Sequence, residues 1–309
     1  IQSGKVDLII GTHALIQDDF VCDKLGLCII DEQHRFGVEQ RKELTRKSGL
    51  ASGGSVGVAG LVPHLCSMTA TPIPRTLALT WYSDLDISEI HQLPKGRKQI
   101  ATQVVPENDR PKVYEFVRQQ MVEGRQVYVI CPLIDASDKL GVKAVTVEKQ
   151  NLERVFSEFK IGLLHGRLKS AEKEDVMSRF KSGEYHMLVA TSVIEVGVDV
   201  ANATVMMVEG AERFGLSQLH QIRGRVGRGE HQSYCYVFPS ETAPSMLARL
   251  NALVQSQDGF ELSQKDLELR GPGELYGTMQ AGLPELRIAN FNDFELTKLF
   301  EEVEKILIK

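Results

Sequence analysis

Several features that would assign a protein to a particular class are missing from this sequence. Its 309 residues include five cysteines without a CxxC pair, at positions Cys22, Cys28, Cys66, Cys131 and Cys235. This pattern argues against a zinc site and a disulfide framework, and it indicates a reducing compartment. No apolar run approaches the roughly 20 residues of a membrane-spanning helix, so we expect no membrane association and no signal peptide.

An excess of basic residues is also missing. The sequence has 36 lysines and arginines against 41 aspartates and glutamates, which gives a formal net charge of −5. Proteins that attract nucleic acid through their overall field carry a clear excess of positive charge. Any nucleic-acid binding by this chain must therefore use a local groove.

The phosphate-binding loop GxxxxGK[ST] does not occur anywhere in the chain. In P-loop nucleotide hydrolases, the backbone N–H groups of that loop and its lysine hold the phosphates. We therefore predict that this chain alone hydrolyses no ATP. It begins at Ile1, within what reads as domain structure, and we expect it to be a fragment of a longer protein.

What is present has the pattern of an α/β protein with two similar domains. Apolar runs alternate with helical stretches, which is typical of parallel sheets, and ligands gather at the carboxyl ends of their strands. Pro, Gly and charged residues interrupt the pattern around 93–97, which indicates a linker. We predict a first domain over 1–96, a second over 97–240 and a helical element over 241–309. The predicted strands are 6–10, 25–30, 65–69, 99–105, 126–131, 160–164, 186–190, 204–208 and 233–238.

Two acids, Asp31 and Glu32, directly follow the predicted strand 25–30. A carboxylate at a strand end can bind the water shell of Mg²⁺, which prefers hard oxygen ligands. The neighbouring acid can orient or deprotonate an attacking water. The alternative is a solvated acidic turn. His34 by itself is more often a structural or surface histidine, and no partner lies at metal-ligand spacing.

Two further polar segments follow predicted strands. Thr69 and Thr71 come after strand 65–69, and their hydroxyls can couple a nucleotide site to a second site, although an N-cap is an equally good interpretation. The segment from Thr191 to Asp199 follows strand 186–190. Gly197 allows close approach of the backbone to a ligand, and Asp199 can accept from a sugar hydroxyl. Its alternative is a turn beside buried valines.

The stretch from Gln221 to Arg228 places Arg225 and Arg228 three residues apart, with glycines between them. If a helix ends here, both guanidinium groups can reach one point, and such groups suit phosphate oxygens. A basic surface turn is the alternative. Two short strand-end segments, one with Thr12 and His13 and the other with His165 and Arg167, are weaker candidates for contacts to a nucleic-acid backbone.

The order of these segments resembles that of the superfamily-two helicase motifs. DEQH at 31–34, TAT at 69–71, TS…GVD at 191–199 and QxxGRxGR at 221–228 all occur in one chain. The longer segments GTHALI at 11–16, DEQHRFGV at 31–38 and MTATPIPRT at 68–76 are similar to those of the RecG family. The stretch DLELRGPGE at 266–274 resembles the TRG element of that family.

This resemblance implies a fold and an activity. The fold would be part of a first RecA-like motor domain, a complete second one, and the helical hairpin and loop of the TRG element. The whole protein would use ATP and Mg²⁺ to translocate on double-stranded DNA and to process forks and four-way junctions. We expect a monomer in the bacterial cytoplasm, associated with the nucleoid, and an interaction with single-stranded DNA-binding protein.

The resemblance also implies residue roles. Asp31 would hold Mg²⁺ through water, Glu32 would act on the attacking water, and Arg228 would be an arginine finger beside Arg225. Gln221 joins this catalytic set, and Gly197 and Asp199 would lie near the nucleotide. The residues implied in DNA contact and coupling are Thr12, His13, His34, Thr69, Thr71, His165, Arg167, Thr191, Arg249 on the hairpin and Gln280 in its loop. Met279 stands where the family usually has arginine.

Two alternatives remain open. One is a translocase of the Mfd type, which acts on RNA polymerase and shares the TATPIPRT wording at 69–76. The upstream sequence would distinguish it, because the RecG family has a wedge domain there. The other is a non-catalytic module that grips duplex DNA without turnover.

Overall fold

The computed structural model of the 309-residue chain describes residues 6–12, 15, 25–32, 64–72, 86–92, 96–132, 139–191, 200–241 and 243–270. Internal contacts divide the chain into two compact units, Ile1–Thr71 and Pro72–Lys309. The domain boundary between residues 96 and 97 stays a prediction. Among the described helices, none is long and apolar enough to cross a membrane.

The first unit contains a two-stranded parallel sheet of β1 (Leu27–Ile30) and β2 (His64–Ser67). Leu27 is 56% exposed and Ile29 is 59% exposed, although parallel sheets are normally covered on both faces. The predicted strand 6–10 is wrong, because these residues form no strand and Ile10 is 86% exposed. A strand needs a neighbour for its N–H and C=O groups, and no described strand lies beside this run.

The second unit is built on a six-stranded parallel sheet with the strand order β3-β8-β7-β4-β6-β5. All six strands that the sequence predicts for this domain are confirmed. Their bounds are β3 Ala101–Val104, β4 Gln126–Cys131, β5 Ile161–Leu164, β6 Met187–Thr191, β7 Ala203–Glu209 and β8 Tyr234–Phe238. This parallel sheet confirms the α/β fold that the sequence predicts for this part of the chain.

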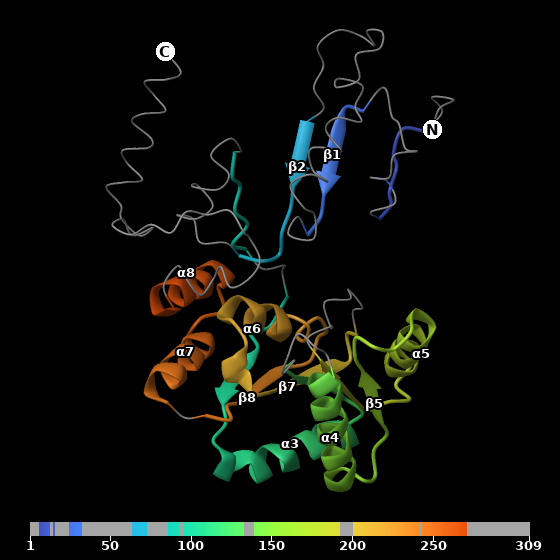
Figure 1. Ribbon diagram of the computed structural model, residues 1–309, viewed down its shortest axis with the longest axis vertical. Coiled ribbons are helices and arrows are strands. Elements are labelled where there is room, and N and C mark those ends of the chain that lie inside the picture. Colours follow the sequence, from blue (N-terminus) through green and yellow to red (C-terminus); the bar gives the residue numbers. More distant parts are fainter. Residues whose placement is uncertain are drawn as a thin grey trace. The chain divides into compact units, whose positions relative to one another are not determined.

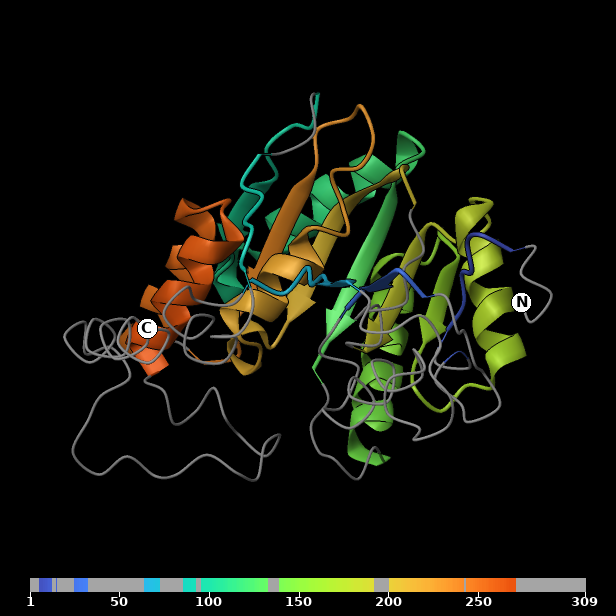
Figure 2. The ribbon, with the colours of Figure 1, turned by 90° about the horizontal axis from the view of Figure 1, so that it is seen from above.

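Helices cover both faces of this sheet (Figures 1 and 2). The helices are α3 Arg110–Val122, α4 Lys139–Val155, α5 Ser170–Lys181, α6 Leu216–Arg223, α7 Pro244–Gln255 and α8 Gly259–Arg270, with short 3₁₀ helices η3 at Glu107–Asp109 and η5 at Ala211–Arg213. In β4, Val127 and Val129 pack with the residues of α3 and α4, whereas Tyr128 and Ile130 pack on the opposite face with those of α5, α6 and α7. Burial on both faces explains why the strands read as continuous apolar runs.

The helix pair α7 and α8 forms the described part of the predicted helical element. Helix α8 packs against both α6 and α7. Residues 271–309, which include Met279, Gln280 and the predicted loop, lie outside the described residues.

Candidate functional site

In the first unit, the acid pair and the two threonines leave the same edge of the sheet. Asp31 follows β1, Thr69 follows β2, and the two strands are parallel neighbours. The N–H of Met68 donates to the carbonyl oxygen of Ile30 at 2.7 Å, so the strands stay paired up to this point. The structure therefore brings two of the predicted motifs together at one carboxyl edge, where ligands of parallel sheets bind.

Glu32 has an unusual backbone conformation at this edge. Its φ is +50°, and among the described residues it is the only non-glycine residue with a positive φ. Such conformations carry strain and cluster at functional sites. The Glu32 N–H donates to Oδ1 of Asp31 at 2.9 Å, which fixes the two acids relative to each other. Asp31 is exposed and offers the hard oxygen that a hydrated Mg²⁺ takes as a ligand, so the residue fits the ion.

In the second unit, the predicted arginine segment spans the end of a helix and the loop that follows it. Helix α6 ends at Arg223, and residues 224–229 form a loop, which we call the arginine loop. The carbonyl oxygen of Gly224 accepts a hydrogen bond from Nε of Arg228 at 3.3 Å and another from Nη2 of Arg97 at 3.2 Å. The carbonyl group of Gly224, directly after α6, therefore helps to hold the side chain of Arg228 in place.

Gly227 shapes this loop. Its φ is +77°, in the left-handed region that favours glycine. A Cβ at this position would lie 3.0 Å from Cγ1 of Ile100, which is buried. Both the conformation and the close approach favour glycine at this position, through which the chain runs from Arg225 to Arg228.

The second unit places three further predicted residues at the other end of the sheet. Thr191 ends β6, and His165 follows β5, so both lie at the carboxyl edge with Arg167. The arginine loop instead packs beside Ile100, which precedes β3. The two groups are separated by about the length of a strand, roughly 17 Å for five residues. The structure therefore does not gather them into one site. His13, His34, Gly197 and Asp199 lie outside the described residues.

The buried hydroxyl of Thr191 has no hydrogen-bond partner among the residues that the structure describes. Buried hydroxyls are normally satisfied, so an unpaired one at the carboxyl edge suits a position that meets a ligand or a neighbouring loop. Arg249 lies on α7, as predicted, and its guanidinium donates to the carbonyl oxygen of Glu212. Gln221 lies on α6.

Contacts around α6 and α8 were missed by sequence reasoning. Arg223 is 2% exposed and holds α7, while Asp266 of α8 accepts from the N–H of Leu216 at 3.1 Å. Asp266 therefore satisfies one of the free N–H groups at the start of α6. One signal was available, because Leu216, Leu219 and Arg223 have the spacing of a single buried helix face.

His91, which precedes the predicted linker, contacts residues at the start of α8. Its Nε2 lies 3.1 Å from Glu89 and its Nδ1 lies 3.3 Å from Asp258, and its ring packs on Phe260 with centroids 4.8 Å apart. The hydrogen bond to Glu89, followed by that to Asp258, raises the pKa of His91 above its ordinary value. The segment 86–92 therefore contacts the start of α8 within the second unit.

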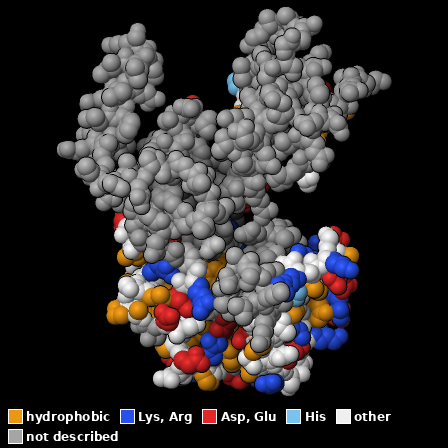
Figure 3. Space-filling view, viewed as in Figure 1, with side chains coloured by type: hydrophobic (Ala, Val, Ile, Leu, Met, Phe, Trp, Pro, Cys, Tyr) orange, Lys and Arg blue, Asp and Glu red, His pale blue; other side chains and the backbone are white. Residues whose placement is uncertain are grey.

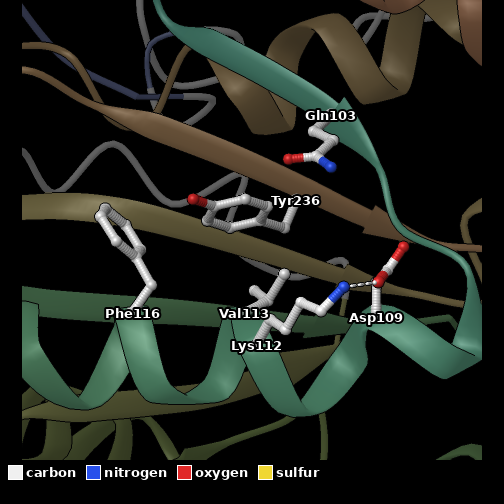
Figure 4. A pocket seen from close by; sticks show the side chains of 6 residues that line it. All are labelled: Gln103, Asp109, Lys112, Val113, Phe116 and Tyr236. Atoms are coloured by element: carbon white, nitrogen blue, oxygen red, sulfur yellow. Dashed lines mark hydrogen bonds and ion pairs between the residues drawn. The ribbon is translucent and has the colours of Figure 1, made fainter.

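A cavity of about 370 Å³ lies between α3 and the β3–β8 edge of the sheet, lined by Gln103, Asp109, Lys112, Val113, Phe116 and Tyr236 (Figure 4). Lys112 and Asp109 pair with each other across its rim at 2.7 Å. None of the predicted site residues lines it. On the face seen in Figure 3, acidic and basic side chains are interspersed over the described part of the second unit, in keeping with the small net charge.

Two family models match parts of the chain, and known proteins are similar to it over nearly its whole length. Residues 111–230 match the family model of the helicase conserved C-terminal domain, and residues 256–308 match that of ATP-dependent DNA helicase RecG, domain 3, C-terminal. The chain is 52% identical to the ATP-dependent DNA helicase RecG of Synechocystis sp., over 100% of the chain and 35% of that protein. It is 47% identical to RecG of Bacillus subtilis, over 94% of the chain and 41% of that protein.

A solved structure of RecG bound to a three-way DNA junction also matches. It is 41% identical with a TM-score of 0.71, and the match covers 96% of this chain and 36% of the solved chain. The chain therefore spans less than half the length of these RecG relatives.

Proposed function

The chain belongs to the RecG family of ATP-dependent DNA helicases, and we propose that it is the motor portion of a translocase that moves on double-stranded DNA and processes branched DNA. The observation that carries this proposal is the 52% identity to a RecG protein over 100% of the chain. The solved relative, which is bound to a three-way DNA junction, supports branched DNA as the substrate class.

We propose separate roles for the acid pair that follows β1, for the arginine loop, and for the carboxyl edge of the second sheet. ATP with Mg²⁺ supplies the phosphoryl group and the charge that its transfer develops. Asp31 would bind the water shell of the metal, and Glu32 would orient the attacking water. Arg228 would stabilise charge on the phosphates, together with Arg225 and Gln221. Gly197 and Asp199 would contact the nucleotide in the same scheme. The exposed Asp31, the strained Glu32 and the loop built around Gly227 support these roles.

We further propose that the carboxyl edge of the second unit contacts DNA. His165 and Arg167 follow β5 there, and Thr191 ends β6. Polar and basic side chains at such an edge suit phosphate contacts, which position a protein on DNA without reading sequence. The DNA-contact and coupling roles of Thr12, His13, His34, Thr69, Thr71, Arg249 and Gln280 stay predictions. So do a monomeric state, an interaction with single-stranded DNA-binding protein, and a place at the nucleoid.

The test uses a full-length protein of the family that contains this chain. Its steady-state ATPase rate is measured without DNA, with linear duplex and with a four-way junction. We expect the junction to stimulate turnover well above the duplex, and Glu32→Gln to remove turnover on every substrate. Equal stimulation by duplex and junction would argue for a plain duplex motor, and no turnover would argue for a non-catalytic DNA-binding module. No observation in the structure favours the alternative of the Mfd type.

A further inference from the structure

The last residue of α6, Arg223, is a buried cation held by neutral groups. Its Nη1 donates to the carbonyl oxygens of Leu253 at 2.6 Å and Ser256 at 2.9 Å, and its Nη2 lies 3.1 Å from Nδ1 of His220. Burial lowers the pKa of Arg223, yet arginine stays charged in proteins. Burying a charge among neutral acceptors costs free energy, and an apolar side chain of similar volume often serves stability as well. This arginine therefore calls for an explanation other than stability.

The groups that Arg223 holds belong to the end of α7. Leu253 lies in the last turn of that helix and Ser256 is its C-cap, so their carbonyl groups are among those without a partner inside the helix. These carbonyl ends carry partial negative charge, which a guanidinium complements. Arg223 therefore fastens the end of α6 to the end of α7.

The arginine loop starts from this fastened point. Gly224 directly follows Arg223, and its carbonyl oxygen is the acceptor for Nε of Arg228. A hydrogen-bonded path therefore runs from the end of α7 through Arg223 and Gly224 to Arg228. Any shift in the last turn of α6 therefore moves the Gly224 carbonyl group that accepts the hydrogen bond from Arg228.

The helix pair α7–α8 also holds α6 at two other points. Asp266 of α8 accepts from the N–H of Leu216 at the start of α6. Gly259, the first residue of α8, packs on the ring of His220, where a Cβ would lie 2.9 Å from Nε2. With Arg223 at its end, α6 is fixed against the helix pair along its whole length.

We propose that Arg223 is a positioning residue for Arg228, which sets the arginine loop by fastening the end of α6 to α7. The inference rests on the proposed function, in which Arg228 acts on the phosphates of ATP. Arg223 itself reaches no nucleotide in this scheme. A displacement of about 1 Å in a catalytic group can lower a rate by about 10²-fold, so loss of Arg223 should reduce kcat strongly.

The first experiment replaces Arg223 with methionine and with lysine in a full-length protein of the family that contains this chain. Kinetics are measured with saturating junction DNA, and folding is checked by circular dichroism. We expect Arg223→Met to lower kcat by about 10²-fold with the KM for ATP and the DNA affinity unchanged. Lysine can still donate to one carbonyl oxygen, so it should recover part of kcat. The matched controls are Arg179→Met and Arg179→Lys, which break a two-pronged contact between α5 and Glu184 and should leave kcat unchanged.

A double variant separates positioning from general damage to the fold. If Arg223 acts through Arg228, then Arg223→Met combined with Arg228→Ala should be no slower than Arg228→Ala alone. Multiplied losses in the double variant would overturn the inference, as would wild-type kcat in folded Arg223→Met. If Arg228→Ala itself keeps full ATPase activity, the finger role in the proposed function fails instead, so the two failures are distinguishable.

Gly259→Ala provides a second route that keeps Arg223 in place, in case Arg223→Met does not fold. Its methyl group would press on the His220 ring at 2.9 Å and on Cγ of Pro72 at 3.0 Å, which shifts the start of α8 against α6. We expect a lower kcat with an unchanged KM for ATP. A folded Gly259→Ala protein with wild-type kcat would contradict the idea that the helix pair sets the arginine loop.

Discussion

Gly227→Ala tests whether the backbone of the arginine loop is fixed by both conformation and packing. At φ +77°, an alanine would occupy the left-handed region, which costs about 1–2 kcal/mol. Its methyl group would also lie 3.0 Å from Cγ1 and 3.2 Å from Cδ1 of Ile100, which is 6% exposed. Overpacking of this kind costs about 1–3 kcal/mol. We therefore expect the free energy of unfolding of the second unit to fall by about 2–5 kcal/mol.

Gly183→Ala is the matched control, because Gly183 has φ +83° but a Cβ added there would meet no atom within 4 Å. It should show the conformational cost alone. Urea unfolding of the chain, followed by far-ultraviolet circular dichroism, should separate the two variants by about 1–3 kcal/mol. In a full-length protein, Gly227→Ala should also lower kcat for ATP, whereas Gly183→Ala should not. Equal destabilisation by both variants would refute the packing argument, and wild-type kcat in Gly227→Ala would refute the argument about loop geometry.

Three further outcomes are expected. Arg228→Ala in a full-length protein should lower the ATPase rate by about 10³–10⁵-fold while DNA binding survives, since arginine fingers contribute on that order; substantial residual ATPase would contradict the assignment. This chain by itself should hydrolyse no ATP, and turnover that disappears in Glu32→Gln would show that prediction to be wrong. Burial lowers the pKa of His220 from 6.5 to about 4, so the unfolded chain binds a proton that the folded chain does not. Stability should be complete above about pH 6.5 and should decline by at most about 3 kcal/mol as pH falls towards 4. Urea unfolding at several pH values checks this, and His220→Gln should show a smaller decline.

The sequence predicts the second unit well because its sheet is covered on both faces. Runs such as Gln126–Cys131 are almost wholly apolar and bounded by polar loops, so strand type and length follow from local composition. The run 6–10 is apolar too, but a strand also needs a hydrogen-bonding neighbour, which composition does not reveal. Helix α4 was not predicted, although Val145 and Leu152 are buried at helical spacing and the buried Phe156 directly follows the helix.

Motif residues at strand ends were also predictable, because parallel strands bring their carboxyl ends to one edge. Asp31 and Thr69 meet there for that reason. The opposite positions of Thr191 and the arginine loop were not predictable in the same way, since the loop precedes β8 instead of following a strand. Contacts such as Arg223 with Leu253 and His91 with Asp258 join residues far apart in the chain. Tertiary packing brings them together, of α7 against α6 in the first case and of segment 86–92 against the start of α8 in the second.

We propose that a full-length protein containing this chain couples ATP hydrolysis to movement on branched DNA. The most direct measurement is the conversion of a labelled four-way junction into separated duplexes by a full-length protein that contains the chain, with and without hydrolysable ATP, for the wild type and for Glu32→Gln. We expect conversion by the wild type with ATP only, and none by Glu32→Gln even when it binds the junction. Conversion that needs no hydrolysis, or that Glu32→Gln performs at the wild-type rate, would contradict it.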